Sequence, residues 1–341
     1  MKVDRDAGTA TGPASMAGLA ADAERAGYDA VWLPEASHDP FIGLALASPH
    51  TERVELGTAI TVAFARNPMT TAYLANDLQS VSKGRFILGL GSQIQPHITK
   101  RFSMPWSHPA PRMREYVSAI RAIWESWATG ERLNFRGDFY THTLMTPFFN
   151  PGPNPYGNPK IFLAGVGEHM TTVAGEVADG FLCHAFTTER YLREVTLPAL
   201  RRGREKVGST LDGFEICGPS FVVTGNNEQE LTDAVTATRK QIAFYGSTPA
   251  YRNVLELHGW GDLHGELNRM SKQGRWDDMT DAIDDEVLRA FAVVGEPERV
   301  ADEILRRYGD VVTRISFYAP YESDPDRWAK VFAALQAAGK D

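Results

Sequence analysis

The chain has 341 residues, of which 43% are hydrophobic, and its formal net charge is −8 at pH 7. A single α/β barrel can reach this size, so we predict one domain over residues 1–341. The negative charge argues against nucleic acid as a partner, and no apolar run approaches the roughly 20 residues of a membrane span. Because the N-terminus has no basic segment followed by an apolar one, we expect a cytoplasmic protein.

Strand-like and helix-like segments alternate along the chain. Apolar runs predict eight strands, at 1–4, 28–33, 54–63, 85–90, 160–164, 180–183, 214–223 and 311–318. Helical periodicity predicts helices at 15–26, 41–47, 70–82, 112–129, 169–178, 189–207, 228–245, 297–308 and 325–338. The alternation implies a parallel sheet, and runs such as FILGL and GFLC suit strands that are covered on both faces. We predict a (β/α)8 TIM barrel, with an open doubly wound sheet as the alternative.

Two insertions interrupt this alternation, near 133–155 and 246–290. The first is rich in aromatic residues, Gly and Pro, and Arg136-Gly137-Asp138 in it resembles a hairpin turn. The second predicts short helices separated by Gly and Pro. Loops of this length usually carry function, for example as lids, and a surface or dimer-contact excursion is the alternative.

The segment PEASHDPF follows the second predicted strand, where a barrel places its chemistry. Glu35, His38 and Asp39 therefore become candidates for general acid–base work, His38 first among them. In the alternative interpretation Asp39 caps the next helix and His38 is an ordinary loop residue.

The third and fourth strands end in small and hydroxyl-bearing residues. Thr58, Ala59 and Ile60 would let a flat ring approach the backbone, although small residues there would also serve barrel packing. Gly91, Ser92 and Gln93 follow the fourth strand and offer hydrogen-bonding groups.

The fifth strand ends in a glycine-bearing loop that leads into a helix. Its residues are Ala164, Gly165, Val166 and Gly167. Backbone N–H groups at such a helix start favour a phosphate, so this loop is the better anion site of the chain. His184 follows the sixth strand and has the position of a ligand contact, with a buried, satisfied histidine as the alternative.

The sequence offers little for other kinds of chemistry. It has no His-x-His pair, no HExxH helix and no G-x-S-x-G elbow, so we expect no metal and no serine nucleophile. A cluster of His38, His97, His184 and Asp39 keeps a metal hydrolase as the last alternative. Cys183 and Cys217 lie in apolar runs, which predicts buried thiols.

The chain resembles the bacterial luciferase-like monooxygenase superfamily, and most closely its branch that uses the deazaflavin coenzyme F420. The resemblance rests on the order and spacing of AERAGYDAVWLPE, HDPF, LGTAI, ARNP, SKGRFILGLGSQ, RMREYVSAIRAIW, GDFY and AGEVADGF. The segments SQIQPHITKRF and FYGSTPAYRNVLELHGW are similar to those of an actinobacterial subgroup of F420-dependent oxidoreductases.

The resemblance implies a cofactor ring at the carboxyl ends of the barrel strands and a phosphate tail near the loop after strand five. It implies a cis peptide bond between Ala59 and Ile60 beside the ring, and places Gly91 and Ser92 at the ring's flank. His184 matches a phosphate-side position. This chain departs from the branch in its second-strand loop, where Glu35-Ala36 replaces a common Asp-His pair, and at Val166, where a second glycine is common.

The function so implied is hydride transfer between C5 of the deazaflavin and a small organic substrate. His38 is the first choice for the proton, and Glu35 and His184 are the next. Aromatic residues of the connecting segments could cover an apolar substrate or pack the insertions: Trp106, Phe139, Tyr140, Phe148 and Trp260. The alternatives are an FMN-dependent monooxygenase on the same fold and a flavin-binding barrel without turnover. The resemblance also implies a homodimer.

Overall fold

The structure is a computed structural model that describes residues 1–321 and 325–338. The chain divides into two compact units. The N-terminal unit comprises Asp4–Leu182 and Ala199–Phe214, and the C-terminal unit comprises Met1–Val3, Cys183–Pro198 and Glu215–Asp341. The predicted single domain over 1–341 stays a prediction.

Parallel strands form the centre of both units. In the N-terminal unit the order is β1 (Lys2–Asp6), β2 (Ala30–Leu33), β3 (Glu55–Thr58), β5 (Phe86–Gly91), β8 (Lys160–Gly165) and β9 (Gly180–Cys183), and the two-residue strand β4 (Thr61–Val62) also pairs with β5. In the C-terminal unit the order is β11 (Ala292–Val294), β10 (Glu215–Val223), β12 (Arg314–Tyr318) and the start of β1, and β10 also pairs with β9. The fold is thus a closed parallel barrel, as the sequence predicts.

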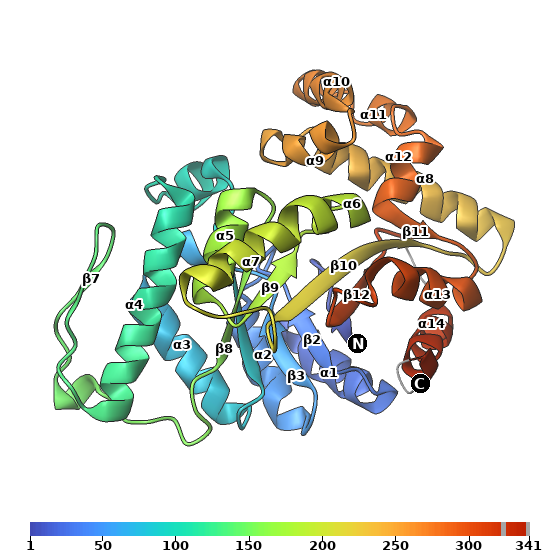
Figure 1. The fold of residues 1–341 in the computed structure, drawn as a ribbon. Coiled ribbons are helices and arrows are strands. Elements are labelled where there is room, and N and C mark those ends of the chain that lie inside the picture. Colours follow the sequence, from blue (N-terminus) through green and yellow to red (C-terminus); the bar gives the residue numbers. More distant parts are fainter. Residues whose placement is uncertain (322–324, 339–341) are drawn as a thin grey trace. The chain divides into compact units, whose positions relative to one another are not determined.

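Helices follow the strands in the order that the sequence predicts. They are α1 (Pro13–Ala26), α2 (Pro40–Ala47), α3 (Pro68–Val81), α4 (Pro109–Thr129), α5 (Glu168–Val177), α6 (Glu189–Tyr191), α7 (Leu197–Lys206), α8 (Glu228–Gly246), α13 (Pro297–Tyr308) and α14 (Pro325–Ala338). In the N-terminal unit α3, α4 and α5 lie on the outer side of the strands (Figure 1). None of the helices within 1–321 and 325–338 is long and apolar enough to cross a membrane.

Large side chains of the strands pack against one another in the interior of the N-terminal unit. Trp32 is buried, donates its indole N–H to Asp4 Oδ2 at 2.8 Å, and lies with its ring centroid 5.9 Å from that of Phe162. Gly57 stands opposite Trp32 in the register, and a Cβ on Gly57 would come within 2.2 Å of the indole. The glycine is therefore required by packing in a close-packed interior.

Four segments differ from the predicted elements. The strand predicted at 54–63 is interrupted between β3 and β4 by the Ala59–Ile60 peptide. The helix predicted at 189–207 contains a π-helical stretch, η5 (Leu192–Thr196), between α6 and α7, and a second π-helical turn, η3 (His97–Arg101), lies where no element is predicted. The strand β11 is also unpredicted, because its three residues are too few to give a pattern.

Both insertions contain the elements expected of them. The first contains the antiparallel pair β6 (Phe135–Arg136) and β7 (Thr141–His142), so the hairpin is confirmed, followed by the 3-10 turn η4 (Pro147–Phe149). The second contains η6 (Pro249–Tyr251), α9 (Arg252–Leu257), α10 (Gly261–Lys272), α11 (Asp278–Asp281) and α12 (Asp285–Phe291). In the C-terminal unit these short helices gather around α8 (Figure 1).

Candidate functional site

In the N-terminal unit, the carboxyl ends of β2 and β3 are joined by backbone hydrogen bonds around an interruption of the third barrel strand. The Ala59–Ile60 peptide bond is cis, which confirms the position that the family resemblance implies. Ala59 N donates to Leu33 O at 3.1 Å, and Glu35 N donates to Ile60 O at 3.0 Å. The interruption, residues 59–62, is therefore fastened to the loop that follows β2, and we call it the strand-three bulge.

Glu35 holds this bulge with its side chain as well. One carboxylate oxygen accepts from Val62 N at 2.8 Å, and both oxygens accept from Arg66 Nη1, at 2.6 and 2.7 Å. Arg66 also donates through Nη2 to Asp39 Oδ2 at 2.6 Å. The Glu35 side chain is 8% exposed, so its oxygens are occupied and shielded. This arrangement suits a residue that positions the backbone.

Electrostatics favour the same interpretation of this network. Burial alone would lower the pKa of Arg66, but the hydrogen bonds and negative charges of Glu35 and Asp39 outweigh it and raise that pKa. The guanidinium therefore stays charged. Asp39 accepts from Phe41 N at 2.9 Å through its other oxygen, which confirms that it caps α2.

His38, in contrast, takes no part in this network of hydrogen bonds and ion pairs. Its side chain is exposed, and no hydrogen bond joins it to the described residues. A Cβ on Gly12, in the loop after β1, would lie 3.7 Å from His38 Nε2. His38 is thus the titratable side chain of this loop that is available to a ligand.

The glycines of β5 fit against the bulge. Thr58 Oγ1 accepts from Gly89 N at 2.9 Å and donates to Gly89 O at 2.7 Å, and Thr58 is fully buried. A Cβ on Gly89 would come within 1.8 Å of Thr58 O, and one on Gly91 within 2.9 Å of the Ile60 side chain. The packing interpretation therefore describes these small residues, and because Thr58 is buried with its hydroxyl engaged, a contact of Thr58 with a ligand stays a prediction.

The segment after β5 contacts the loop after β2. Gln93 has a left-handed backbone, with φ of 58°, and its side-chain oxygen accepts from Ile94 N at 3.2 Å. Ser92 Oγ donates to Gln93 O at 3.1 Å. Further on, Arg101 Nη2 donates to Ala36 O at 2.7 Å. A non-glycine residue at positive φ is uncommon and occurs preferentially at functional sites.

The loop between β8 and α5 keeps backbone donors uncapped. Gly167 is the N-cap of α5, and no side chain caps that helix. A Cβ on Gly167 would meet nothing within 4 Å, whereas one on Gly165 would approach Met170 at 3.1 Å. Open space at a helix start without a side-chain cap suits a phosphate, and the anion site expected at Ala164, Gly165, Val166 and Gly167 stays a prediction.

In the C-terminal unit His184 directly follows β9 and lies among aromatic rings. Its Nδ1 accepts from Phe186 N at 3.0 Å, and its Nε2 lies 3.1 Å from Tyr251 Oη. The Tyr251 and Tyr245 ring centroids are 4.5 and 4.9 Å from that of the imidazole. Burial lowers the pKa of His184 to about 4, so the ring is neutral at neutral pH. Both ring nitrogens of His184 therefore have partners, which agrees with the alternative of a buried, satisfied histidine.

The second insertion supplies the partners of this loop. Tyr251 comes from η6, and His258 Nε2 lies 2.8 Å from Thr188 Oγ1. His258 also stacks on Trp260, with centroids 4.4 Å apart. The sequence pattern alone assigns no role to Tyr245, Tyr251 and His258. Their position at or beyond the end of the predicted helix 228–245 was the one signal that could have pointed to them.

The first insertion is fastened to α4 instead. Glu115 accepts from the backbone of the hairpin turn, at 2.9 Å from Asp138 N and 2.7 Å from Phe139 N. Arg112 Nε donates to Tyr140 Oη at 2.8 Å. Tyr140 is thus a packing residue here. Trp106 likewise packs on Phe64, at 5.7 Å between centroids, and Phe148 is 88% exposed.

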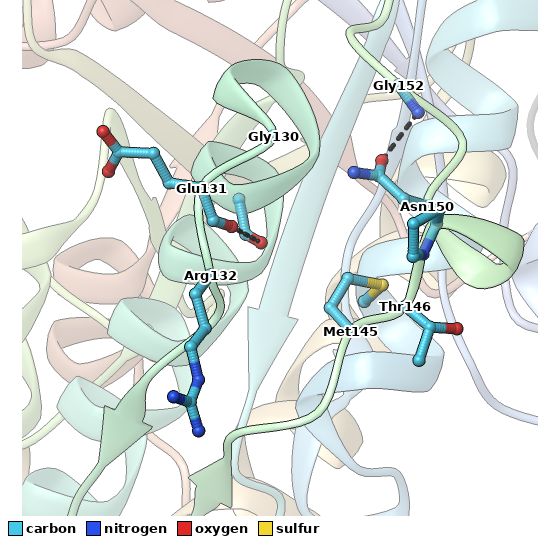
Figure 2. Close-up of a pocket in the computed structure, with 9 residues that line it drawn as sticks. Gly130, Glu131, Arg132, Met145, Thr146, Asn150 and Gly152 are labelled. Carbon is cyan, nitrogen blue, oxygen red and sulfur yellow. Dashed lines mark hydrogen bonds between the residues drawn. The ribbon is translucent and has the colours of Figure 1, made fainter.

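A groove of about 560 Å³ lies between the end of α4 and the first insertion. Figure 2 shows Arg132 on one side and Met145 and Asn150 on the other. The groove adjoins Gly130, at the carboxyl end of α4, whereas a βα barrel carries its chemistry at the carboxyl ends of the strands, where the following helices begin. We therefore place the candidate site at the strand ends and not in this groove.

Two further expectations concern metals and thiols. Within residues 1–321 and 325–338, no group of three or more His, Cys, Asp or Glu side chains is arranged to hold a metal ion. Cys183 and Cys217 are both buried and form no disulfide, as predicted, and burial raises the pKa of Cys183 to about 12.

Comparison with known proteins places the chain among oxidoreductases. The profile of the family described as luciferase-like monooxygenase matches residues 1–314. An uncharacterized protein of Mycobacterium tuberculosis is 58% identical over 89% of both chains, and an F420-dependent glucose-6-phosphate dehydrogenase of Nakamurella multipartita is 31% identical over 60% of this chain and 62% of its own. The structure of the coenzyme F420-dependent tetrahydromethanopterin reductase from Methanopyrus kandleri is similar in fold, with a TM-score of 0.80 at 20% identity over 99% of each chain. The chain belongs to the luciferase-like monooxygenase family.

Proposed function

We propose that this protein is an F420-dependent oxidoreductase that transfers a hydride between C5 of the deazaflavin and a small organic substrate. The observation that carries the proposal is that the N-terminal unit has both the strand-three bulge and a helix start without a side-chain cap at carboxyl ends of its strands. The relative named as an F420-dependent dehydrogenase supports it, since 31% identity extends over 60% of this chain.

The residues of the N-terminal unit fit a flat ring with an anionic tail. Ala59 and Ile60 are partly exposed at the strand mouth, and Gly91 packs against the Ile60 side chain, so these residues would form the surface on which the ring lies. Ser92 and Gln93 would border the ring, and Thr58 would support it from behind. The backbone of Ala164, Gly165, Val166 and Gly167 would hold the phosphate at the start of α5.

When bound, the deazaflavin supplies two-electron hydride chemistry at C5. The protein then has to orient the substrate, exclude water and handle one proton. We assign the proton to His38, because it is exposed and has no partner among the described residues. Glu35 would act through Arg66 and the bulge, as a positioning residue. His184, whose two ring nitrogens both have partners, stays a prediction as a further site residue.

Equilibrium titration with oxidised F420 and, separately, with FMN tests the cofactor. We expect F420 to bind and FMN to bind at least tenfold more weakly. FMN binding without F420 binding would favour the monooxygenase, and binding of F420 without turnover of any enone, imine or ketone would favour a non-catalytic barrel. The matched variants Gly167→Asp and Gly167→Ser then test whether the tail lies at α5.

We also propose a cytoplasmic homodimer. The family resemblance is the ground for this, and α2 exposes two large apolar side chains, Ile42 and Leu46. Light scattering of the purified protein at micromolar concentration would give the mass of one chain if the proposal is wrong. Charged substitutions at both positions would separate a dimer through α2 from a dimer through another face.

A further inference from the structure

The first insertion carries the most exposed apolar side chains among the described residues. Phe148 is 88% and Leu144 is 76% exposed, and Phe149 is exposed as well. Single exposed apolar residues are common on monomeric proteins, but three within six residues form a patch, and such patches mark interaction sites. The patch belongs to the N-terminal unit and follows the carboxyl end of α4, whereas the candidate site lies where the helices begin.

Hydrogen bonds hold the aromatic part of this patch in place. Phe149 N donates to Thr146 O at 3.0 Å, and Phe149 O accepts from Tyr73 Oη of α3 at 2.6 Å. The rings of Phe148 and Phe149 pack edge to face, with centroids 5.0 Å apart, and we call these two residues the aromatic knob. Because the backbone of the knob is already ordered, a partner that binds it loses less entropy on association.

The groove between the end of α4 and the first insertion lies next to the knob. Its apolar wall comes from Met145 and Pro147, and Pro147 directly precedes Phe148 in η4. Figure 2 shows Met145 on the wall across from Arg132. The volume of about 560 Å³ falls within the roughly 300–1,000 Å³ of pockets that bury a drug-sized ligand, so an aromatic side chain fits. A surface with a knob beside a groove can match a second copy of itself, because a two-fold axis places each knob over the groove of the other copy.

The charges in the groove favour a second copy over an acidic or a basic partner. Glu131 and Arg132 both line it, and neither side chain has an ion-pair or hydrogen-bond partner within 1–321 and 325–338. One acid and one base give the groove no net charge, so it attracts neither class of partner. Between two copies, Glu131 of each can meet Arg132 of the other, and both charges are then compensated. Since each chain has a net charge of −8, a contact between copies is favoured where the charge is locally balanced.

We propose that the first insertion is a contact between two copies of this chain, in which the aromatic knob of each copy enters the groove of the other and Glu131 pairs with Arg132 across the interface. The inference deepens the proposed homodimer, on which it rests, and gives that dimer a face other than α2. It involves neither the cofactor nor the hydride transfer. The occupant of each groove is Phe148 of the other copy, the most exposed aromatic side chain among the described residues.

The first test is the dissociation constant of the dimer, measured by sedimentation equilibrium of the full chain. We expect Phe148→Asp to raise this constant at least about 100-fold, because the contact would then bury an unpaired charge in place of its central aromatic ring. Phe244→Asp is the matched control, since it makes the same change at an exposed phenylalanine of α8 in the C-terminal unit. It should leave the constant within about threefold of the wild-type value.

Charge reversal tests the pairing of Glu131 with Arg132. Glu131→Arg and Arg132→Glu each place like charges across the two-fold axis, so each should raise the dissociation constant at least about tenfold. An equimolar mixture of the two variants brings unlike charges together at both positions. We therefore expect it to form a mixed dimer with nearly wild-type affinity, whereas a local structural defect in either variant would not be repaired by mixing.

The outcomes separate this inference from the proposals on which it builds. A wild type that sediments as one chain at micromolar concentration would overturn it together with the proposed homodimer, and the groove would then belong to another occupant. A dimer that persists in Phe148→Asp and dissociates when Ile42 and Leu46 are both changed to Asp would place the contact at α2 and overturn this inference alone. Charge variants that stay monomeric when mixed would overturn the pairing. Titration with F420 reports on the proposed activity separately, because the contact shares no residue with the candidate site.

Discussion

In the N-terminal unit the strands end among paired charges and bare backbone, whereas in the C-terminal unit they end among neutral aromatic rings. The charges of the first region are bound to one another: Arg66 joins Glu35 and Asp39 and fixes the strand-three bulge. In the second region burial keeps His184 neutral, and its Nε2 contacts the Tyr251 hydroxyl. The comparison teaches that the ion pairs of the first region hold the backbone, while the exposed His38 is the side chain of its loop that is free to meet a ligand.

The largest expected effect comes from removing the cation of the first region. In Arg66→Met the Glu35 carboxylate, 8% exposed, loses its charged partner. Breaking a buried ion pair in this way should lower the free energy of unfolding by about 3–5 kcal/mol, measured by urea denaturation. The exposed pair of Arg25 and Asp22 is the control, and Arg25→Met should change stability by less than about 1 kcal/mol. Similar losses in both variants would contradict the role given to Arg66.

The second region should respond to pH instead. Below a pH of about 6.5 the unfolded chain protonates His184, but the folded protein does not until its pKa of about 4. The unfolded state therefore binds more protons in this window, and stability falls as pH drops from about 6.5 to about 4, by about 1.4 kcal/mol per unit. In His184→Asn the difference in unfolding free energy between pH 7 and pH 4.5 should shrink by roughly 2 kcal/mol.

The exposed His97 provides the control for that measurement, since His97→Asn should keep the wild-type difference. If His184→Asn also kept it, the imidazole would not be the neutral group that the hydrogen bonds require. The same pair of variants would show whether the second region alone accounts for the acid sensitivity of the protein.

A charge placed in the first region should separate ligand binding from stability. Gly167→Asp puts a carboxylate at the N-cap of α5, where it favours the helix and repels a phosphate. We expect F420 affinity to fall at least about tenfold, or roughly 1.4 kcal/mol, with the midpoint of thermal unfolding unchanged or raised. Gly167→Ser caps the same helix without charge and should retain more of the affinity. Equal affinities in the two variants would remove the phosphate from this helix.

The sequence predicted the barrel because its signals are local. Continuous apolar runs such as FILGL mark strands covered on both faces, and α13 and α14 begin and end where the pattern of 297–308 and 325–338 puts them. The break in the strand at 54–63 has no such signal, because Ala59 N donates to Leu33 O and Ile60 O accepts from Glu35 N, and both partners lie more than twenty residues away. Family resemblance, rather than pattern, located the cis peptide.

The candidate site was predictable only in part for a similar reason. Position along the chain puts Glu35, His38 and His184 at strand ends, but it does not say which of them is already engaged. Arg66 binds Glu35 and Tyr251 contacts His184 through contacts between distant segments, while the bond from Phe186 N to His184 is local. Tyr251 itself lies in an insertion whose helical breaks predict no fixed place for a single side chain.

The smallest expected effect concerns Asp39, which belongs to the charged network but also caps a helix. Its side chain is 40% exposed, so its bond to Arg66 contributes little, while its bond to Phe41 N satisfies a donor of α2. Asp39→Ala should therefore lower the unfolding free energy by about 1 kcal/mol, and Asp39→Ser, which can still cap, by less than half of that. Equal losses in the two variants would show that the charge matters more than the cap, and Asp39 would then be part of the clamp on the bulge rather than of the helix start. Denaturation in high salt would separate these causes further, because screening weakens an exposed ion pair and leaves a cap nearly unchanged.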